Sequence, residues 1–264
     1  MPTGKLRGGG WGKLTQDYTN PDVITAVLGI CTFGATIGKE GYRNTTTIHP
    51  NLKTAIAEAP TVSADILLQP NKSRLEVCPD LNSLPSHWTA SPLGITDKAE
   101  GSKTRIHHLS YPLGDISGIN AGITEHYGAI QLGRIEDTIQ VVELFGRNSI
   151  LMKRDFESAF HPIPISPIDH PLLGFQWEEA FYAEHFPPFG LRTAPYQFNL
   201  GVEVFHCILE QQLQMANITA TIIHYLEDYL LVLDPGAIVN LKRSSKIFTT
   251  LCAQVGLRIK TGKK

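Results

Sequence analysis

The sequence predicts an α+β fold in which a sheet is covered by helices. Segments 193–213 and 238–255 place apolar residues at helical spacing, whereas 149–152 and 218–235 are short apolar runs typical of strands. The two kinds of segment alternate along the chain. At 264 residues, the chain is long enough to bury a substantial core.

The composition indicates a folded protein without an overall attraction for nucleic acid. Hydrophobic residues make up 42% of the chain and charged residues 18%, which is typical of globular domains. The formal net charge is −2, so the molecule as a whole does not attract a polyanion. A nucleic-acid site would therefore have to be a local basic patch.

The cysteines and the N-terminal segment favour an intracellular protein. Cys31, Cys78, Cys207 and Cys252 lie far apart and form no CxxC pair, so we expect free, buried thiols. The first residues, MPTGKLRGGGWGKL, lack the apolar segment of a signal peptide. No apolar run reaches the roughly 18 residues that a membrane span needs. We therefore expect a location in the cytoplasm or nucleus, without secretion.

Three regions are predicted along the chain. Residues 1–20 are rich in glycine and mildly basic, which predicts a flexible arm. Residues 21–90 form an N-terminal extension with short helical candidates at 22–29 and 50–59. Residues 91–264 carry a clearer succession of strands and helices.

The elements of this third region follow from apolar spacing and end signals. Gly146 and Gly256 each follow an apolar helical pattern, and glycine commonly ends helices. Thr193 is suited to cap a helix with Pro195 in its first turn. The buried stripe of that helix is expected to consist of Phe198, Val202, Phe205, Leu209 and Leu213. In chain order, we expect a strand at 104–109, a helix at 136–145, a strand at 149–152, a hairpin of 172–177 and 180–184, the helix after Thr193, a hairpin within 218–235, a helix at 238–255 and the start of a strand at 257–260.

Two adjacent acids interrupt the apolar hairpin ITATIIHYLEDYLLVLDP. A tight hairpin turn favours Asn-Gly or Asp-Gly, so Glu227-Asp228 is poor turn chemistry and suggests a functional demand. The two carboxylates repel each other, and a bound Mg²⁺ would relieve that repulsion. On these residues alone, a solvated acidic turn remains the alternative.

A third acid, Asp155, follows the strand predicted at 149–152. If that strand lies beside the hairpin, Asp155 meets Glu227 and Asp228 at one point. Three carboxylates around two metal ions are the arrangement used for phosphoryl and nucleotidyl transfer. A two-metal nuclease would use the same arrangement, so the carboxylates alone do not separate the two activities.

Four motifs resemble reverse transcriptases, which are RNA-directed DNA polymerases. They are SPLGITDKAEGSKTRIHHLSYP (91–112), KRDFESAF (153–160), PLLGFQWEEAFYAEHFPPFGLRTAPYQFN (171–199) and HYLEDYLLVL (224–233). They stand in the family's order over about residues 91–260, and their wording is most similar to retrotransposon enzymes of the DIRS-like, tyrosine-recombinase group.

The resemblance implies a polymerase fingers-and-palm fold, with an antiparallel palm sheet backed by helices. It also implies transfer of deoxynucleotides to a primer 3′-hydroxyl, with Mg²⁺ or Mn²⁺ as the cofactor. The partners implied are an RNA or DNA primer–template and dNTPs. Asp155, Glu227 and Asp228 match the catalytic metal ligands, and Phe156 matches the residue whose backbone carbonyl joins them.

Four further residues match the family's dNTP site. Lys98 and Arg105 match the cations that hold the triphosphate, where positive charge stabilises the leaving pyrophosphate. Phe160 matches the steric gate against a 2′-hydroxyl, and Phe189 matches the segment that packs on the nascent base pair. Ordinary surface cations and a core aromatic are the alternatives for these positions.

Some basic residues of the motifs have simpler interpretations. His107 and His108 are neighbours on a predicted strand, so they point to opposite faces and do not readily chelate one ion. We expect both to be structural. Lys263 loosely matches a lysine proposed to protonate pyrophosphate, with an ordinary tail lysine as the alternative.

The sequence departs from the family pattern in two ways. Glu227 stands where the family has an Asp, and the chain reaches only residue 264, just past the palm helix and before a thumb. A side chain longer by one methylene moves the carboxylate, and a misplacement of about 1 Å can cost about 10²-fold in rate. We therefore expect impaired catalysis. The alternative is a catalytically silent retrotransposon relic that at most binds nucleic acid or a partner.

Overall fold

The fold was analysed in a computed structural model. It describes residues 6–16, 18–41, 45–69, 74–98, 101–128, 130, 132–157, 160–235 and 238–260. The chain forms two compact units that interleave in sequence. The first contains Met1–Thr3, Phe33–Ala129 and Ile163–Ala194, and the second contains Gly4–Thr32, Ile130–Pro162 and Pro195–Lys264. This differs from the expected division at residues 20 and 90, because strands from both sides of residue 90 join one sheet.

The first unit is built on a five-stranded sheet of order β1-β3-β7-β8-β2. Its strands are β1 (Thr47–Ile48), β2 (Leu75–Cys78), β3 (Thr89–Ala90), β7 (Gly174–Trp177) and β8 (Ala180–Glu184). β1, β3 and β7 run parallel, whereas β8 is antiparallel to both β7 and β2. Trp177 pairs with Ala180, so Glu178 and Glu179 form the expected hairpin turn.

Short helices and a second hairpin complete the first unit. The helices are α3 (Lys53–Ala57) and α4 (Ala59–Leu68), and the hairpin joins β4 (Leu93–Asp97) to β5 (Lys103–His107). The described part of this unit also contains four 3₁₀ helices: η2 (Leu81–Ser83), η3 (Asn120–Gly122), η4 (Glu125–Gly128) and η5 (Pro167–Leu173). The buried core of α3, α4 and the strands consists of Ala55, Val62, Ile66, Leu75, Leu93, Phe175 and Trp177.

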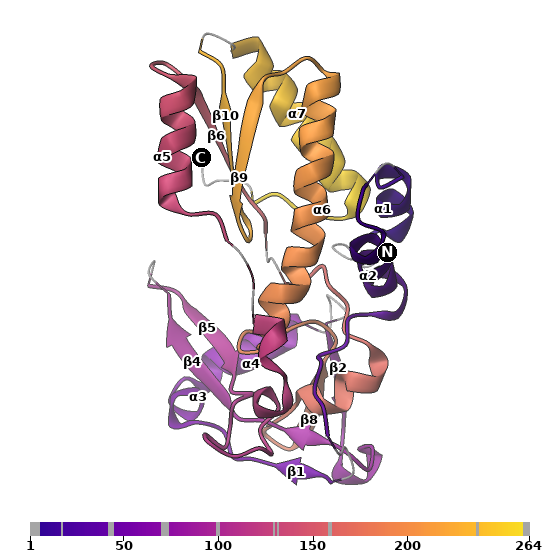
Figure 1. The fold of residues 1–264 in the computed structure, drawn as a ribbon. Helices are drawn as coiled ribbons and strands as arrows, with labels where there is room; N and C mark the ends of the chain where they lie inside the picture. The colour runs from indigo at the N-terminus through magenta and orange to yellow at the C-terminus, as the bar shows by residue number, and fades with distance from the viewer. Residues whose placement is uncertain are drawn as a thin grey trace. The chain divides into compact units, whose positions relative to one another are not determined.

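The second unit holds a three-stranded antiparallel sheet of order β6-β10-β9. The strands are β6 (Ile150–Asp155), β9 (Ala220–Tyr225) and β10 (Asp228–Leu233). In Figure 1, α5 (Ile135–Phe145) lies on one side of this sheet, and α6 (Ala194–Met215) and α7 (Ile238–Val255) lie on the other. The structure thus confirms the helices and strands of this region that were predicted between residues 136 and 255, and β6 runs three residues further than expected, to Asp155.

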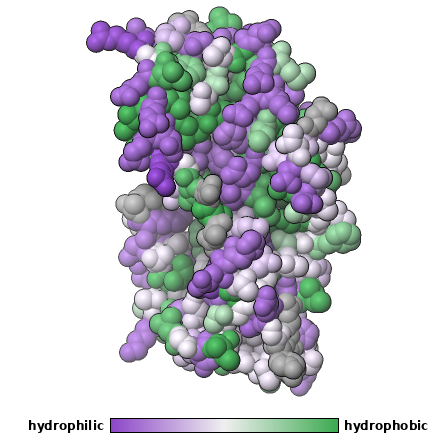
Figure 2. Space-filling model, viewed as in Figure 1, coloured by the Kyte–Doolittle hydropathy of each residue, from purple (hydrophilic) through white to green (hydrophobic). Residues whose placement is uncertain are grey.

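The two sides of this sheet are packed differently. The five apolar residues expected on the buried stripe of α6 are all buried. By contrast, α5 keeps Ile135, Ile139 and Leu144 exposed. Apolar side chains among charged ones are visible over this helix in the space-filling view (Figure 2). The core of the second unit therefore lies between the sheet, α6 and α7.

The described residues among 1–20 contain helix α1 (Gly8–Leu14), whereas a flexible arm was expected there. Helix α2 (Pro21–Phe33) follows. Trp11 is fully buried, and the Arg7 N–H donates to the Val255 carbonyl at 2.9 Å. A Cβ at Gly10 would lie 2.1 Å from the Gln254 carbonyl oxygen, so glycine is needed for α1 to approach α7 closely. Gly10, one of the glycines that suggested flexibility, instead permits packing.

The remaining sequence expectations have mixed outcomes. Cys31, Cys78, Cys207 and Cys252 are free thiols, with Cys78 and Cys252 buried and the other two half-buried. The expected strand at 257–260 is reduced to a single bridge between Phe156 and Ile259. None of the helices in the described part of the chain is long and apolar enough to cross a membrane.

Candidate functional site

Asp155 and Asp228 are direct partners across β6 and β10 of the second unit. Directly opposite residues of an antiparallel pair project to the same face, with Cα atoms about 4.5–5.5 Å apart. Their side chains are 26% and 47% exposed. The structure therefore brings together two of the predicted metal ligands on a solvent-facing side of the sheet.

The opposite face of these strands is anchored by aromatic packing. Tyr229 follows Asp228 in β10 and points away from it, as alternate strand residues do. Its ring contacts Phe156, Phe205 and Phe248 at centroid distances of 5.3–5.6 Å, and its hydroxyl donates to the Val202 carbonyl at 2.7 Å. Each such aromatic pair contributes about 0.5–1.5 kcal/mol beyond simple burial. This packing fixes the strand orientation that turns the two carboxylates outward.

Glu227 lies in the hairpin turn next to the carboxylate pair. Asp228 pairs with Tyr225, so the turn residues are Leu226 and Glu227, whereas we had expected Glu227-Asp228. The Glu227 carbonyl accepts a hydrogen bond from the Phe156 N–H at 3.1 Å, which holds the turn against the end of β6. Leu226 adopts a φ of +49°, which costs a residue with a Cβ about 1–2 kcal/mol. Strained residues of this kind concentrate at functional sites.

Two lysines contact the carboxylates. Lys153 Nζ lies 2.9 Å from Asp228 Oδ1, and Lys260 Nζ lies 2.9 Å from Asp155 Oδ2. The hydrogen bond to Asp228 raises the pKa of Lys153 above its usual value. The Lys260 backbone N–H also donates to the Asp155 carbonyl at 2.8 Å, so the segment after α7 is held beside β6.

Neither lysine was predicted from the sequence. Lys153 stands two residues before Asp155 on β6 and shares its face, so strand alternation could have indicated it. Lys260 reaches Asp155 through the bridge between Phe156 and Ile259, for which the sequence holds no local signal. Lys263 lies outside the described residues.

The donor set fits a hard divalent cation. Asp155 and Asp228 supply carboxylate oxygens, the ligands that Mg²⁺ prefers, and they are exposed enough to admit a hydrated ion. The ammonium groups of Lys153 and Lys260 already lie at hydrogen-bond distance from these oxygens. Positive charge is therefore favoured here, and both lysines are exposed enough to move aside.

A pocket of about 720 Å³ opens in front of Asp228 on the same face of the sheet. Lys153, Tyr225 and Leu230 line it from the strands, and Gly133 and Arg134 line it where the chain enters α5. Asp228 therefore borders a space large enough for a ligand.

The comparison with known families identifies the family of the chain. The sequence model described as "Reverse transcriptase (RNA-dependent DNA polymerase)" matches residues 107–264, more than half of the chain. The chain belongs to the reverse transcriptase family.

Solved structures show the same fold. The crystal structure of prototype foamy virus protease-reverse transcriptase superposes with a TM-score of 0.54 at 15% identity, covering 97% of this chain and 33% of that one. The foamy viral protease-reverse transcriptase in complex with double-stranded DNA gives 0.57 at 14% identity, covering 98% and 43%. This reverse transcriptase domain therefore has the expected fingers-and-palm fold and spans less than half of those chains. A search of curated proteins found no match.

The structure places Lys98 and Phe189 at the surface of the first unit. Lys98 follows β4 and is exposed, and its backbone N–H donates to the Ser102 carbonyl at 2.7 Å. Phe189 is about half exposed, and its carbonyl accepts from the His107 N–H at 3.1 Å. Both side chains are open to a ligand, and their roles in dNTP binding remain predictions.

Arg105 of the reverse transcriptase domain is enclosed by acidic partners. Its Nε lies 2.7 Å from Asp65 Oδ2, one of its terminal nitrogens lies 2.8 Å from Glu184 Oε1, and the guanidinium stacks 4.9 Å from the Phe175 ring. The side chain is only 9% exposed. Its charge is thus balanced inside the first unit, so a triphosphate would have to compete with two carboxylates. The expected dNTP role stays a prediction.

Phe160 and His107 have packing contacts within their own units. Phe160 is half-buried and packs edge-to-face on Phe198 at 6.0 Å, which suits either a steric gate or a core aromatic. His107 is buried, its Nε2 lies 3.0 Å from the Gly174 carbonyl, and its ring meets Phe175 edge-on. These contacts agree with the structural role expected for His107.

Proposed function

We propose that this domain catalyses RNA-directed DNA synthesis, by divalent-metal-dependent transfer of deoxynucleotides to a primer 3′-hydroxyl. The observation that carries the proposal is the cross-strand pair of Asp155 and Asp228, with Glu227 in the adjoining turn. Membership of the reverse transcriptase family supports this reaction over that of a two-metal nuclease.

In this proposal Asp155, Glu227 and Asp228 hold Mg²⁺ or Mn²⁺ through their carboxylates, and Phe156 contributes its backbone carbonyl. The ions would polarise the reacting phosphate and favour ionisation of the primer hydroxyl. Lys153 and Lys260 would have to leave the carboxylates for the ions to be held there, and their charges would remain nearby to attract the negatively charged substrate.

The proposed dNTP site uses Lys98, Arg105, Phe160 and Phe189. The exposure of Lys98 and Phe189 supports contacts with a triphosphate and a base pair, respectively. The edge-to-face contact with Phe198 supports a fixed ring at Phe160, as a steric gate requires. Arg105 would contact the triphosphate in competition with its ion pairs to Asp65 and Glu184.

The proposed partner is a primer–template, since the foamy viral relative has been solved with double-stranded DNA. The net charge of −2 restricts such binding to local basic groups. The HHLSYP, LLGFQW and PFGLR motifs support an origin in a DIRS-like retrotransposon, and action in the cytoplasm or nucleus would follow from that origin.

Primer extension on an RNA template with Mg²⁺ or Mn²⁺ tests the proposal. We expect incorporation of dNTPs by the wild type, its loss in Asp155→Asn, and no change in Asp22→Asn, which alters an exposed acid in α2. Incorporation that survives Asp155→Asn would refute the assignment. No incorporation by either the wild type or Glu227→Asp would favour the catalytically silent relic.

A further inference from the structure

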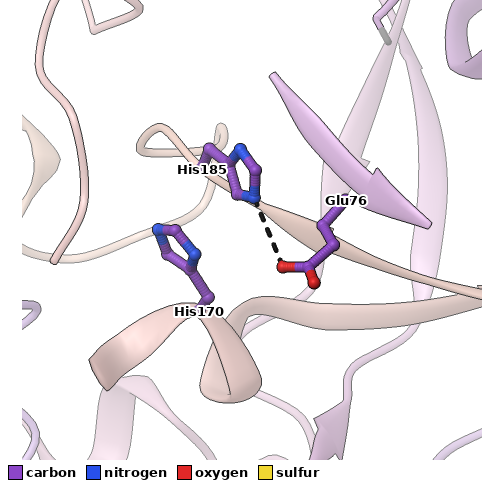
Figure 3. Close-up of side chains that lie close together, drawn as sticks. All are labelled: Glu76, His170 and His185. Atoms are coloured by element: carbon purple, nitrogen blue, oxygen red, sulfur yellow. Dashed lines mark ion pairs between the residues drawn. The ribbon is translucent and has the colours of Figure 1, made fainter. Parts of the chain in front are cut away.

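Three potential metal ligands converge in the first unit, apart from the carboxylate pair. Glu76 lies in β2, His170 lies in η5 and His185 directly follows β8. Figure 3 shows their side chains turned toward a common space. One ligand atom from each lies within 4.8 Å of the other two. We propose that Glu76, His170 and His185 bind a divalent transition-metal ion of the zinc class.

The distances are close to those of a bound ion. Zinc–ligand bonds of about 2.0–2.1 Å in a tetrahedron place neighbouring ligand atoms about 3.4 Å apart. His185 Nε2 and Glu76 Oε2 are 3.5 Å apart, which already matches that spacing. The two imidazole rings stack at a centroid distance of 4.4 Å with an interplanar angle of 24°, so their in-plane lone pairs run nearly side by side. For an ion to bind, one ring would rotate toward the other ligands, and ligand atoms up to 4.8 Å apart would move closer by about 1.4 Å.

The backbone of Ile165 lies within hydrogen-bond distance of both histidines. His170 Nε2 lies 3.1 Å from the Ile165 carbonyl oxygen, and the Ile165 N–H donates to the His185 carbonyl at 2.8 Å. A donated N–H from one ring nitrogen leaves the other, Nδ1 of His170, with a free lone pair. Metal-binding histidines characteristically donate their second nitrogen to a carbonyl in this manner.

The backbone around these histidines is itself well held. Ile165 is buried and forms a bridge with Ala35, and the His185 N–H donates to the Arg74 carbonyl at 2.9 Å. The backbone positions of the two histidines are therefore set before an ion arrives, which lowers the ordering cost of binding.

The environment of His170 is unlike that of a surface ion pair. Burial, reinforced by the neighbouring His185, lowers the pKa of His170 below its usual value. A simple ion pair between His185 and the exposed Glu76 would contribute little to stability, and it would not involve His170.

Imidazole nitrogens with one carboxylate favour zinc, cobalt, nickel or copper over Mg²⁺, which prefers oxygen ligands alone. Three protein ligands leave a fourth tetrahedral position for water or another ligand. The ion would tie edge strand β2 to η5 and to the end of β8, which both lie far along the chain from β2. The site would therefore stabilise the first unit and is independent of the polymerase carboxylates.

Cobalt binding tests this site directly, because tetrahedral Co²⁺ absorbs visible light far more strongly than octahedral Co²⁺. The full chain, free of any histidine tag, would be titrated with Co²⁺ and the bound Co²⁺ displaced by Zn²⁺. We expect one tetrahedral Co²⁺ per chain. Loss of an outer-shell partner alone weakens metal sites by about 10–100-fold, so His185→Ala and Glu76→Gln should weaken binding at least about 100-fold.

Controls separate this site from other histidines and from the carboxylate pair. His87→Ala removes a half-buried histidine outside the cluster and should leave binding unchanged, as should Asp155→Asn. Glu76→Gln changes an exposed side chain and keeps its shape, so circular dichroism of this variant should match the wild type. Octahedral Co²⁺, or equal binding by the wild type, His185→Ala and Glu76→Gln, would overturn the proposal.

Discussion

Asp155 and Asp228 face each other across β6 and β10, so two acids from separate motifs share one face of one sheet. The aromatic packing of Tyr229 and Phe156 on the other face sets this orientation. The metal chemistry proposed for this reverse transcriptase domain depends on that relationship.

Replacing Glu227 by Asp should increase polymerase activity. Aspartate is shorter by one methylene, and a misplacement of about 1 Å at a reacting centre can cost about 10²-fold in rate. We expect Glu227→Asp to raise kcat for primer extension by about 10–100-fold. Glu179→Asp makes the same change in an exposed turn and serves as the control. Unchanged or lower activity in Glu227→Asp would show that the longer side chain is not the limiting feature.

Removing a lysine beside the carboxylates should strengthen divalent-metal binding. An exposed ion pair is worth about 0.2–1 kcal/mol, so Lys153→Met or Lys260→Met should tighten Mn²⁺ binding by up to about 5-fold. Mn²⁺ titration followed by electron paramagnetic resonance measures this affinity. Lys246→Met, an equal charge change on the exposed side of α7, should have little effect. Weaker Mn²⁺ binding in the two site variants would contradict the competition between lysine and metal.

His107 should make stability depend on pH. Burial, reinforced by the charge of Arg105, lowers the pKa of His107 to about 3, against about 6.5 in the unfolded chain. Between these values only the unfolded state binds the proton, so the free energy of unfolding falls as pH falls, by about 1.4 kcal/mol per pH unit. Above the unfolded-state pKa of about 6.5, the ring is neutral in both states and the titration of His107 costs no free energy of unfolding.

Urea unfolding at pH 6.5 and pH 5 measures this contribution. His107→Gln keeps a donor for the Gly174 carbonyl and removes the titration, so it should lose about 1.6 kcal/mol less than the wild type over this interval. His87→Gln should behave like the wild type. An equal loss in the wild type and in His107→Gln would show that His107 does not titrate as its burial requires.

Glu178 in the β7–β8 turn should be a site of stabilising substitution. Its φ of +53° is unfavourable for a residue with a Cβ by about 1–2 kcal/mol, and glycine avoids this at a smaller entropic cost. We expect Glu178→Gly to raise the free energy of unfolding by about 0.5–1 kcal/mol in urea titrations. Glu179→Gly should lower it, because Glu179 is not among the residues with positive φ. Loss of stability in both variants would exclude strain at Glu178.

The sequence predicted those parts of the fold whose apolar spacing is long and regular. The buried stripe of α6 and the β9–β10 hairpin were predicted from periodicity. The proximity of Asp155 to Asp228 was predicted from the chemistry of carboxylates together with the motif order.

Other features depend on contacts that leave no local pattern. β1 and β3 have only two residues each, too few to show alternation, and they join a sheet with distant β7. The partners of Arg105, Asp65 and Glu184, are also far away in sequence. The glycines of α1 resembled a flexible arm because close packing and flexibility both favour glycine. The β9–β10 turn begins at Leu226, one residue earlier than predicted, because Leu226 adopts the strained positive φ that such turns usually assign to glycine or asparagine.

The most direct test of the central claim is the Mn²⁺ content of the carboxylate site. Electron paramagnetic resonance would follow Mn²⁺ binding in a background of His170→Ala and His185→Ala, which removes the proposed transition-metal site. The account predicts Mn²⁺ binding that is lost in Asp155→Asn with Asp228→Asn and retained in Asp22→Asn. Equal Mn²⁺ binding with and without the Asp155 and Asp228 carboxylates would contradict it.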